Sequence, residues 1–542
     1  MPPLARRPLP LPSSGPLAAR DALLGLLTLV VAALALACSD LPSEDRAPTA
    51  ALPAGAAGNE PPRSTRGARP NIVLILADDL GFGDVGVYAP NSLIPTPYID
   101  QLARDGVRLL DAHSPASICT PSRYAILTGA DPWREVRVRN SLQPLSPPVL
   151  SADQPTLPSL LADWGYTTVL VGKWHLGRRY SLRPGRDQPI ARDIDWTAPL
   201  LDGPLQHGFQ RFFGLARPGW TFMEDGVALA APTEAFDLGD VPKALYGKRA
   251  HTGIRAPGFR YDQVLPRYTR WTEQWIDEFG RASEPFFLEF APAVPHTPIA
   301  PSAAFQGRTE VGAYGDIVAE LDDSVGRILA ALERNGLADD TLVVFTSDNG
   351  PETHAYERLR RTGHASMGAL RGAKHSLFEG GHRVPFIARW PEHIPPNTSS
   401  TETLSLVDLL ATFAAAAGVP VPASAGVDSH DALPILRGEL QSAPVRAFTL
   451  HNRGRFAEVR RGPWVLLDHG GAGRAEPLWF LEERGMSPLR RGYPQLFELD
   501  QDPSQTKNRI DEEPVIAEEL RALAKRVRES TRTAPRPDET TP

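Results

Sequence analysis

The sequence predicts an α/β protein with a large mixed, mostly parallel sheet sandwiched by helices, and a smaller C-terminal α+β domain carrying a short antiparallel sheet. From Pro70 onward, short apolar runs alternate with amphipathic segments, as they do when helices cover both faces of a buried sheet. After about Gly438 the apolar runs are shorter and further apart, and the last amphipathic segment has an apolar face from Ile516 to Val527. The 542 residues, 42% of them hydrophobic, suffice for both domains.

Each predicted element follows from local pattern. Short apolar runs bounded by turn residues predict buried strands over Asn71–Ala77, Val107–Leu110, Thr167–Val171, Phe286–Ala291 and Thr341–Thr346, with short C-terminal strands over Pro463–Leu467 and Gln495–Leu499. Amphipathic segments predict helices over Tyr98–Arg104, Thr156–Trp164, Asp316–Arg334 and Leu404–Ala417. Residues 178–266 are rich in Pro, Gly and Arg and lack periodicity, so we expect loop insertions over an edge of the sheet.

Residues 1–37 are predicted to be an export signal rather than part of the fold. Arginines precede Ala22–Ala37, a mostly apolar run of 16 residues, whereas a membrane-spanning helix needs about 20. The sequence Ala35-Leu36-Ala37-Cys38 predicts lipoprotein-type cleavage with a lipid on Cys38, while its Ala-x-Ala also fits ordinary signal peptidase. An uncleaved anchor is the third alternative. We therefore expect a periplasmic or outer-membrane, cell-surface lipoprotein of a bacterium, or else a secreted protein.

The remaining chain divides by composition. Residues 38–69, rich in Ala, Pro, Gly and Ser, are predicted to be a flexible linker. Residues 70–438 form the main domain, and residues 439–542 form the C-terminal α+β subdomain with a disordered tail from about residue 530. The net charge of −7 argues against nucleic acid as a partner. We expect membrane attachment only through the possible lipid.

Cysteine is scarce. The two cysteines, Cys38 and Cys119, exclude a disulfide scaffold, and a lipid on Cys38 would leave Cys119 as a lone thiol in an oxidising compartment. Pro121 predicts that Cys119 lies near a helix N-terminus, where the helix dipole stabilises a bound anion and activates a nucleophile. Arg123 would lie one turn further on the same face. A small buried residue remains the alternative interpretation of Cys119.

Polar residues follow four of the predicted strands. They are Asp78 and Asp79, then Lys173 and His175, then His296, and finally Asp348 and Asn349. Ligands bind beyond the carboxyl ends of the strands in open α/β sheets, so we expect these residues to meet at one edge. The carboxylate and amide oxygens suit Ca²⁺ or Mg²⁺, and no spacing typical of a zinc site is present. Asp348 and Asn349 could also form a turn.

The segment Cys119-Thr120-Pro121-Ser122-Arg123 resembles the C-x-P-x-R signature of type I sulfatases, and the following Leu127-Thr128-Gly129 also fits. The resemblance extends from about Pro70 to Asp502. Other matching segments are Asn71 to Asp79, Gly172 to Gly177, Pro295 to Pro298, Thr346 to Gly350, Gly372 to Lys374, Phe378 to Gly381 and Leu496 to Leu499. The chain is therefore identified as a member of that family, within the alkaline phosphatase superfamily.

The resemblance implies an alkaline-phosphatase-like fold and an arylsulfatase-like sulfuric ester hydrolase acting on aryl sulfates or sulfated carbohydrates. In that family the motif cysteine, Cys119 here, is oxidised to Cα-formylglycine (3-oxoalanine) by a formylglycine-generating enzyme. One hydroxyl of the hydrated aldehyde attacks sulfur and expels the alcohol or phenol. The other then loses its proton, and the aldehyde re-forms as sulfate leaves.

The resemblance also assigns roles to individual side chains. One Ca²⁺ per chain, with Mg²⁺ less favoured, would be bound by the converted Cys119 and by Asp78, Asp79, Asp348 and Asn349. Arg123 and Lys173 would support the formylglycine and the sulfate, and His175 would handle the hydroxyl proton. His296, as general acid, and Lys374 would face the leaving-group oxygen.

Two other functions stay open. A phosphonate or phosphodiester hydrolase of the same superfamily can also use formylglycine, although the Lys173 and Lys374 segments favour sulfate. The second alternative is a surface-anchored binder of sulfated glycans in which Cys119 is never converted.

Overall fold

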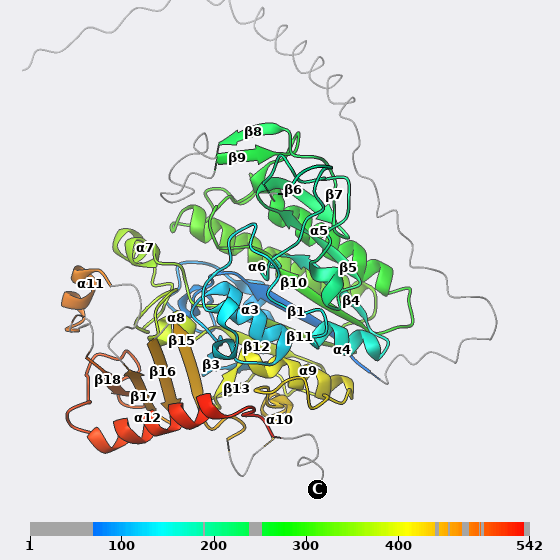
Figure 1. Cartoon of the computed structure of the whole chain (residues 1–542). Coiled ribbons are helices and arrows are strands. Elements are labelled where there is room, and N and C mark those ends of the chain that lie inside the picture. Colours follow the sequence, from blue (N-terminus) through cyan, green and yellow to red (C-terminus); the bar gives the residue numbers. More distant parts are fainter. Residues whose placement is uncertain are drawn as a thin grey trace, which may run out of the picture. The chain divides into compact units, whose positions relative to one another are not determined.

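Four parallel strands form the middle of the main sheet and position the residues that follow them. They are β11 (Thr341–Ser347), β1 (Asn71–Ala77), β10 (Phe286–Ala291) and β4 (Thr167–Gly172), adjacent in that order. All three pairings between them are parallel, with Ile72 opposite both Leu342 and Phe287. The computed structural model describes residues 69–187, 190–237, 252–439, 444–453, 456–468, 476–486, 488 and 493–535 (Figure 1). The predicted export signal and residues 38–68 of the predicted linker lie outside them.

Mixed pairing extends this sheet on both sides, to 12 strands among the described residues. Beyond β11 lie, in order, β12 (Phe386–Arg389), β2 (Val107–Leu109) and β13 (Thr398–Ser400). Beyond β4 lie, in order, β5 (Arg211–Ala216), β6 (Gly219–Glu224), β9 (Thr252–Arg255) and β8 (Glu234–Asp237). The short strand β7 (Val227–Ala228) pairs with β6. A separate two-stranded pairing joins β3 (Ala112–His113) to β14 (Leu404–Ser405).

Helices cover both faces of the sheet because successive strand residues point to opposite sides. Ile72, Leu74 and Leu76 belong to one apolar core, whereas Val73 and Ile75 belong to a second. The first core includes side chains of α3 (Cys119–Thr128), α4 (Leu157–Asp163) and α9 (Leu409–Ala417), and the second includes those of α2 (Pro97–Arg104), α5 (Val264–Phe279) and α6 (Ala313–Arg334). No helix among the described residues is both long and apolar enough to cross a membrane.

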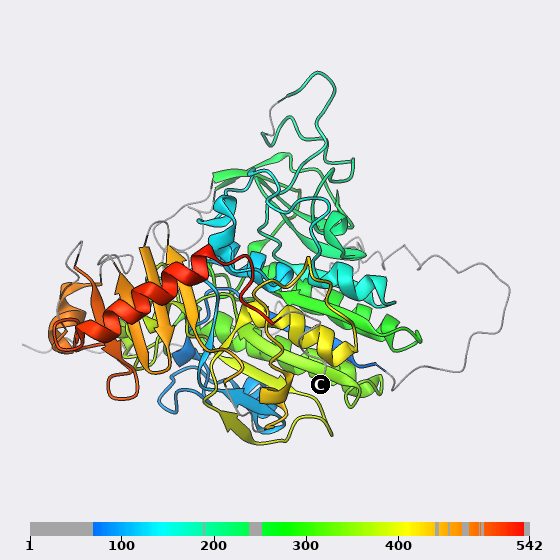
Figure 2. The ribbon, with the colours of Figure 1, turned by 60° about the horizontal axis from the view of Figure 1, so that its bottom comes forward.

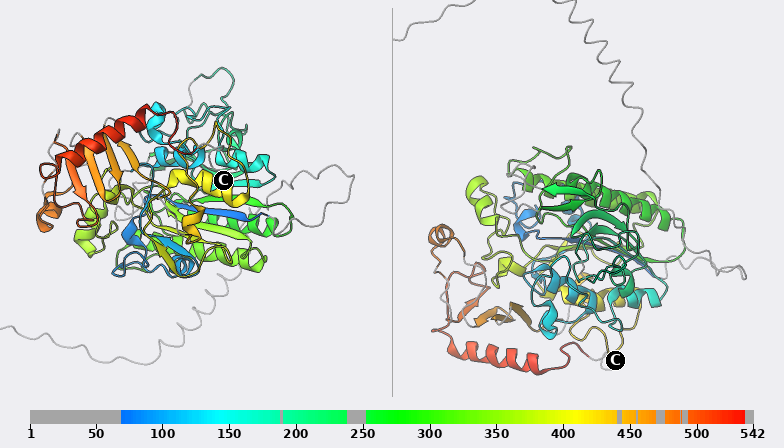
Figure 3. Two further views of the ribbon diagram at one scale, coloured as in Figure 1. Left: turned by 90° about the horizontal axis from the view of Figure 1, so that it is seen from below. Right: turned by 45° about the horizontal axis from the view of Figure 1, so that its top comes forward.

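The C-terminal part forms its own small sheet. The strands β15 (Thr449–Arg453), β16 (Phe456–Arg461), β17 (Trp464–Asp468) and β18 (Gln495–Glu498) pair antiparallel in that order. The closing helix α12 (Pro514–Glu529) lies across one face of this sheet (Figures 2 and 3). Leu520 and Val527 pack there against Leu466 and Leu496. The predicted fold class, a large mixed sheet between helices with a smaller antiparallel sheet, is confirmed.

The remaining α-helices among the described residues are short: α7 (Ala355–Thr362), α8 (Glu379–His382), α10 (Leu433–Leu436) and α11 (Leu478–Glu483). The predicted domain boundary at residue 438 falls between α10 and β15 and stays a prediction.

Two sequence predictions need correction. The helix predicted from Leu404 begins only at Leu409, because Leu404–Ser405 pairs with β3 and the Asp408 carboxylate accepts a hydrogen bond from Ser405 N at 3.0 Å. Within the described part of residues 178–266, β5 to β9 extend the sheet, where the sequence predicted loops alone. The predicted disordered tail from about residue 530 stays a prediction; of its residues the structure describes those up to 535, and Thr533 N donates to Val427 O at 2.9 Å.

Candidate active site

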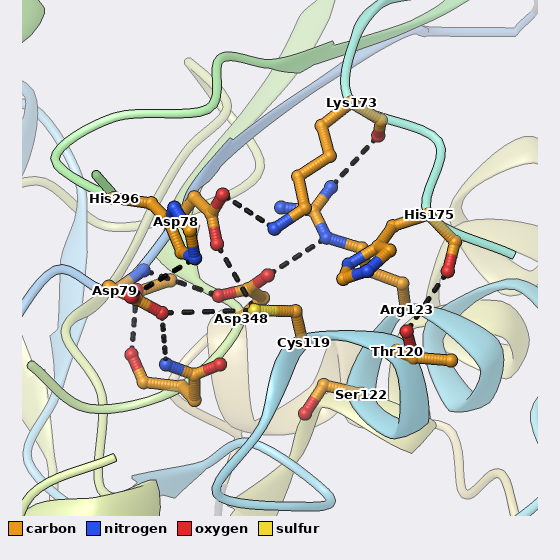
Figure 4. Close-up of polar contacts among 12 residues, drawn as sticks. Asp78, Asp79, Cys119, Thr120, Ser122, Arg123, Lys173, His175, His296 and Asp348 are labelled. Atoms are coloured by element: carbon orange, nitrogen blue, oxygen red, sulfur yellow. Dashed lines mark hydrogen bonds and ion pairs between the residues drawn. The ribbon is translucent and has the colours of Figure 1, made fainter. Parts of the chain in front are cut away.

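The carboxyl ends of β11, β1, β10 and β4 lie at one edge of the sheet, and the polar residues that follow these strands meet there (Figure 4). Asp348 and Asn349 follow β11, Asp78 and Asp79 follow β1, His296 lies beyond β10, and Lys173 and His175 follow β4. Cys119 and Arg123 reach the same place from α3, and Lys374 reaches it from the loop before α8. The structure thus brings every predicted site residue together.

Asp78 and Asp79 continue the path of β1 into the site. Asp78 N donates to Val294 O at 2.9 Å, which ties this turn to the loop carrying His296. Asp79 has a φ of +70°, a left-handed conformation that Asp adopts more readily than most residues. Both carboxylates are buried, so each needs a charged partner or a cation.

Cys119 is the first residue of α3, as predicted, and it is buried. Its Sγ lies 3.3 Å from Asp78 Oδ1, 3.8 Å from Asp79 Oδ1 and 3.0 Å from Lys374 Nζ. Burial, reinforced by the Asp348 carboxylate, raises the pKa of the Cys119 thiol. An unmodified Cys119 would therefore be a protonated thiol and a weak nucleophile.

Two lysines flank the thiol, each paired with one of the two aspartates. Lys173 Nζ lies 2.6 Å from Asp78 Oδ2, and Lys374 Nζ contacts Asp79 Oδ1. Burial alone would raise the pKa of Asp78, but Lys173 and the neighbouring cations hold it well below its usual value. Burial would likewise lower the pKa of Lys374, but Asp79 and the neighbouring carboxylates raise it well above its usual value. Both of these groups are therefore charged at neutral pH.

Arg123 links α3 to two strand ends. Its Nε lies 2.8 Å from Asp348 Oδ2, and its Nη1 donates to Lys173 O at 3.0 Å. Its Nη2 is buried without a hydrogen-bond partner. Arg123 therefore positions Asp348 and the Lys173 backbone and still has a donor available.

The two histidines have defined tautomers because each bonds to a backbone carbonyl, which can only accept. His296 Nδ1 donates to Thr297 O at 2.6 Å, leaving Nε2 3.9 Å from Asp79 Oδ2. His175 Nε2 donates to Leu142 O at 3.1 Å, leaving a buried Nδ1 without a partner. Burial, together with Lys173, lowers the pKa of His175 well below its usual value, so Nδ1 keeps a free lone pair.

The donor set fits a hard divalent cation. Side-chain atoms of Asp78, Asp79, Cys119 and Asp348 lie within 4.8 Å of one another. Asn349 Oδ1 is buried beside them without a hydrogen-bond partner, while its Nδ2 donates to Asp79 Oδ1 at 2.7 Å. Burial and the Asp78 carboxylate raise the pKa of Asp348 to about 6, although Arg123 and Lys173 oppose this rise. Oxygen ligands of this kind suit Ca²⁺ or Mg²⁺.

One positioning contact was not predicted from the sequence. Thr120 Oγ1 donates to His175 O at 3.1 Å and accepts from Leu142 N at 3.1 Å. Since Leu142 O also accepts from His175, Thr120 and Leu142 together hold the imidazole. Leu142 lies in an irregular segment with no sequence signal, whereas Thr120 lies next to Cys119 inside the signature, where it could have been considered.

The family follows from a match over most of the chain. The family model described as Sulfatase matches residues 70–419. The chain belongs to the sulfatase family. Members of this family are sulfuric ester hydrolases, in agreement with the sequence prediction. Arylsulfatase A of Bos taurus is 35% identical to this sulfatase over 491 residues, covering 88% of this chain and 89% of that protein.

A curated protein and a solved structure, both from Bacteroides thetaiotaomicron, are also similar to this sulfatase. An N-acetylgalactosamine-6-O-sulfatase is 30% identical over 501 residues, covering 85% of this chain and 93% of that protein. A solved structure from work on the metabolism of multiple glycosaminoglycans has a TM-score of 0.73 and 28% identity, covering 85% of this chain and all of that chain.

Proposed function

We propose that this protein is an exported sulfatase that hydrolyses sulfate esters, aryl sulfates or sulfated carbohydrates, to an alcohol and sulfate. The observation that carries the proposal is the position of Cys119. This residue begins a helix and lies between two lysines and a cluster of buried carboxylates, where an anion and a nucleophile would meet. The named relatives act on sulfate esters of different alcohols, so the natural alcohol stays open.

The proposal includes one Ca²⁺, with Mg²⁺ the less favoured ion. Asp78, Asp79, Asp348 and Asn349 would hold it together with position 119, and the unpartnered Asn349 Oδ1 supports this assignment. The ion would neutralise charge on the sulfate oxygens.

Conversion of Cys119 to formylglycine is the second part of the proposal. The hydrated aldehyde would supply a hydroxyl nucleophile at position 119. The raised pKa of the Cys119 thiol supports conversion, because the unmodified side chain would be largely un-ionised at neutral pH. A formylglycine-generating enzyme would then be a partner during maturation.

The remaining side chains bind the sulfate and move protons. Lys173 would bind sulfate oxygens, and the free Nη2 of Arg123 would hold the substituent at position 119. Lys374, which contacts Cys119 Sγ, would face the leaving-group oxygen. His175 Nδ1 has the lone pair needed to accept a proton from that substituent. In a neutral His296 the single ring proton is on Nδ1, where it is donated to Thr297 O. Only the imidazolium form therefore has a second proton, on Nε2, to donate to the leaving oxygen. Burial lowers the pKa of His296 and so disfavours that form, and the Asp78 and Asp79 carboxylates only partly offset this effect.

Export is proposed from residues 1–38 alone. A lipid on Cys38 would place the enzyme on a bacterial membrane surface facing the periplasm or the exterior, and ordinary cleavage would release it. Labelling cells with a fatty-acid analogue would show incorporation into the parent protein and none into Cys38→Ser. Equal labelling of both would contradict the lipid assignment.

The reaction class is tested by kcat/KM on 4-nitrophenyl sulfate and on bis(4-nitrophenyl) phosphate under the same conditions. We expect kcat/KM to be higher for the sulfate ester than for the phosphodiester. A higher kcat/KM for the phosphodiester would indicate the phosphodiester hydrolase instead.

Conversion of Cys119 is tested by mass spectrometry. The tryptic peptide Leu109–Arg123, from protein made in a host with a formylglycine-generating enzyme, should show the aldehyde. An entirely unmodified thiol in that peptide would overturn the mechanism and favour a glycan-binding role.

A further inference from the structure

Three histidines far apart in the sequence meet where the C-terminal sheet contacts the main domain. His113 ends β3, His382 ends α8, and His451 lies in β15. At most 1% of each residue is exposed. The ring centroids of His113 and His382 are 5.2 Å apart, and those of His382 and His451 are 4.0 Å apart. None of the three has a role in the proposed sulfatase reaction.

In each of the three imidazoles, Nε2 lies within hydrogen-bond distance of an oxygen atom. His113 Nε2 lies 3.0 Å from Asp111 Oδ1. His382 Nε2 lies 3.2 Å from Leu377 O, and His451 Nε2 lies 2.9 Å from Ser114 O. Backbone carbonyls and ionised carboxylates only accept hydrogen bonds, so each Nε2 carries the proton in these contacts. A neutral imidazole in that tautomer has its lone pair on Nδ1.

Two of the three Nδ1 atoms therefore face each other inside the cluster, and the third faces a carboxylate. His113 Nδ1 and His382 Nδ1 lie 3.0 Å apart, and His451 Nδ1 contacts Glu458 Oε2. If His113 and His382 are neutral and carry their protons on Nε2, neither of their Nδ1 atoms can donate a hydrogen bond to the other. Burial lowers the pKa of both His113 and His382, which disfavours an additional proton there. Glu458 outweighs burial and raises the pKa of His451, so a metal ion at this Nδ1 would have to displace a proton shared with Glu458.

A different tautomer of His113 is the competing explanation. With its proton on Nδ1, His113 would donate to His382 Nδ1 and accept at Nε2 from Arg460 Nη1, which lies 3.0 Å away. That arrangement would turn the Nε2 lone pair toward the Asp111 carboxylate at 3.0 Å. This tautomer would form a hydrogen bond between His113 and His382, but it would place two hydrogen-bond acceptors, His113 Nε2 and Asp111 Oδ1, against each other.

We propose that His113, His382 and His451 bind a divalent transition-metal ion such as Zn²⁺ through their Nδ1 atoms, with Glu458 as the fourth ligand. Three imidazoles and a carboxylate form a donor set typical of zinc. The oxygen partners at Nε2 are those that orient metal-binding histidines in proteins. Glu458 Oε1 is buried without a hydrogen-bond partner, which is the second, independent indication of a missing ligand.

The local charge also favours a cation. With neutral histidines, three carboxylates contact the cluster or its direct partners (Asp111, Glu379 and Glu458), against two guanidinium groups (Arg383 and Arg460). Four protein ligands and full burial describe a closed, structural site rather than a catalytic one. Such an ion would fasten the C-terminal sheet to β3 and to α8, whose neighbouring segments carry Cys119 and Lys374.

The zinc content of the purified full chain, expressed in zinc-supplemented medium and desalted, tests the proposal by plasma mass spectrometry. We expect about one zinc ion per chain in the parent and at least about a tenfold loss in His382→Gln and in Glu458→Gln. His430→Gln, a control at a histidine outside the cluster, should keep the metal. Cys119→Ala should also keep it, so the result is independent of the sulfatase mechanism.

X-ray absorption at the zinc edge of the parent protein keeps the test decisive even if a variant fails to fold. We expect three imidazole nitrogens and one oxygen at about 2.0–2.1 Å. A sulfur neighbour would place the zinc at Cys119 and overturn the proposal. Absence of zinc from the parent would also overturn it, in favour of a hydrogen-bonded network using the other His113 tautomer. Unchanged zinc content in His382→Gln would likewise overturn the proposal.

Discussion

At the scale of single residues, the choice of lysine is the most informative feature of the site. The chain has 57 basic residues but only six lysines, and two of these, Lys173 and Lys374, lie in the active site. An ammonium group is a compact charge that fits between Asp78 and a sulfate oxygen, whereas a guanidinium group is planar and larger. Position 173 should therefore not accept arginine although the rest of the chain favours it.

Lys173→Arg is predicted to lower kcat/KM for 4-nitrophenyl sulfate by about 10²-fold or more, the typical effect of losing one oriented charge-stabilising donor. The Lys173 side chain is 15% exposed and lies 2.6 Å from Asp78, so the larger group has no room to keep this geometry. The matched control is Lys525→Arg on the exposed side of α12, which should keep parental kinetics. Parental kcat/KM in Lys173→Arg would show that charge alone matters at this position.

His296→Gln is predicted to affect poor leaving groups more than good ones. A general acid contributes about 10²–10⁴-fold where the leaving oxygen needs a proton, as in an alkyl or carbohydrate sulfate. Nitrophenolate leaves without one, so the loss in kcat on 4-nitrophenyl sulfate should be much smaller. The measurement is kcat for a series of aryl and alkyl sulfates plotted against the pKa of the leaving group. Equal losses across the series would assign His296 to sulfate binding instead.

The sequence predicted which residues meet, but not how they pair. Asp78, Asp348 and Lys173 could be placed together because each follows a strand of one parallel sheet. The pairing of Asp78 with Lys173, and of Asp79 with Lys374, depends on side-chain directions set by packing between segments far apart in sequence. Sequence pattern alone therefore cannot show which lysine neutralises which aspartate.

At the scale of elements, whether a strand could be predicted from the sequence depended on how completely its two faces are buried. The four central strands were predicted because both of their faces are covered, which makes their sequences continuously apolar. Strands β8 and β9 at the sheet edge were missed, since exposed residues such as Glu234 interrupt the apolar pattern. The start of α9 was misplaced because strand pairing of Leu404–Ser405 overrode a helical pattern.

The end of β4 gives the prediction that belongs to this scale. Gly172 has a φ of +116°, and a Cβ there would lie 2.1 Å from Ala291 O on the neighbouring strand. Gly172→Ala should separate the ends of β4 and β10, move Lys173 and lower kcat by about 10²-fold, as expected for a displacement near 1 Å. Thermal unfolding and kcat are measured together.

Gly165→Ala is the matched control for this variant. Gly165 has a φ of +85° but no atom within 4 Å of its added Cβ, so it reports the cost of backbone strain alone. Its kcat should stay near parental while its melting temperature falls modestly. Equal loss of kcat in the two variants would show that steric overlap at β10 is not the cause.

At the scale of the whole molecule, the junction between the sulfatase domain and the C-terminal part is polar as well as apolar. Arg371 lies in the segment leading to Lys374, and it pairs with Glu476 at 2.8 Å with both side chains at most 2% exposed. Its Nη1 also donates to Gln505 O at 2.9 Å. Nothing in the sequence indicated this contact, because a lone Arg and a lone Glu about 100 residues apart are ordinarily solvent-exposed.

Arg371→Met is predicted to lower the free energy of unfolding by about 3–5 kcal/mol, because Glu476 would remain buried without its cation. The double variant Arg371→Met/Glu476→Gln should recover most of that loss, since no buried charge is then left unpaired. Lys507→Met, which breaks the exposed pair with Glu512, should cost less than about 1 kcal/mol. Urea unfolding of the four proteins, followed by tryptophan fluorescence, measures these differences. A double variant as unstable as Arg371→Met would show that shape and hydrogen bonding at Arg371, rather than charge pairing, join the two parts.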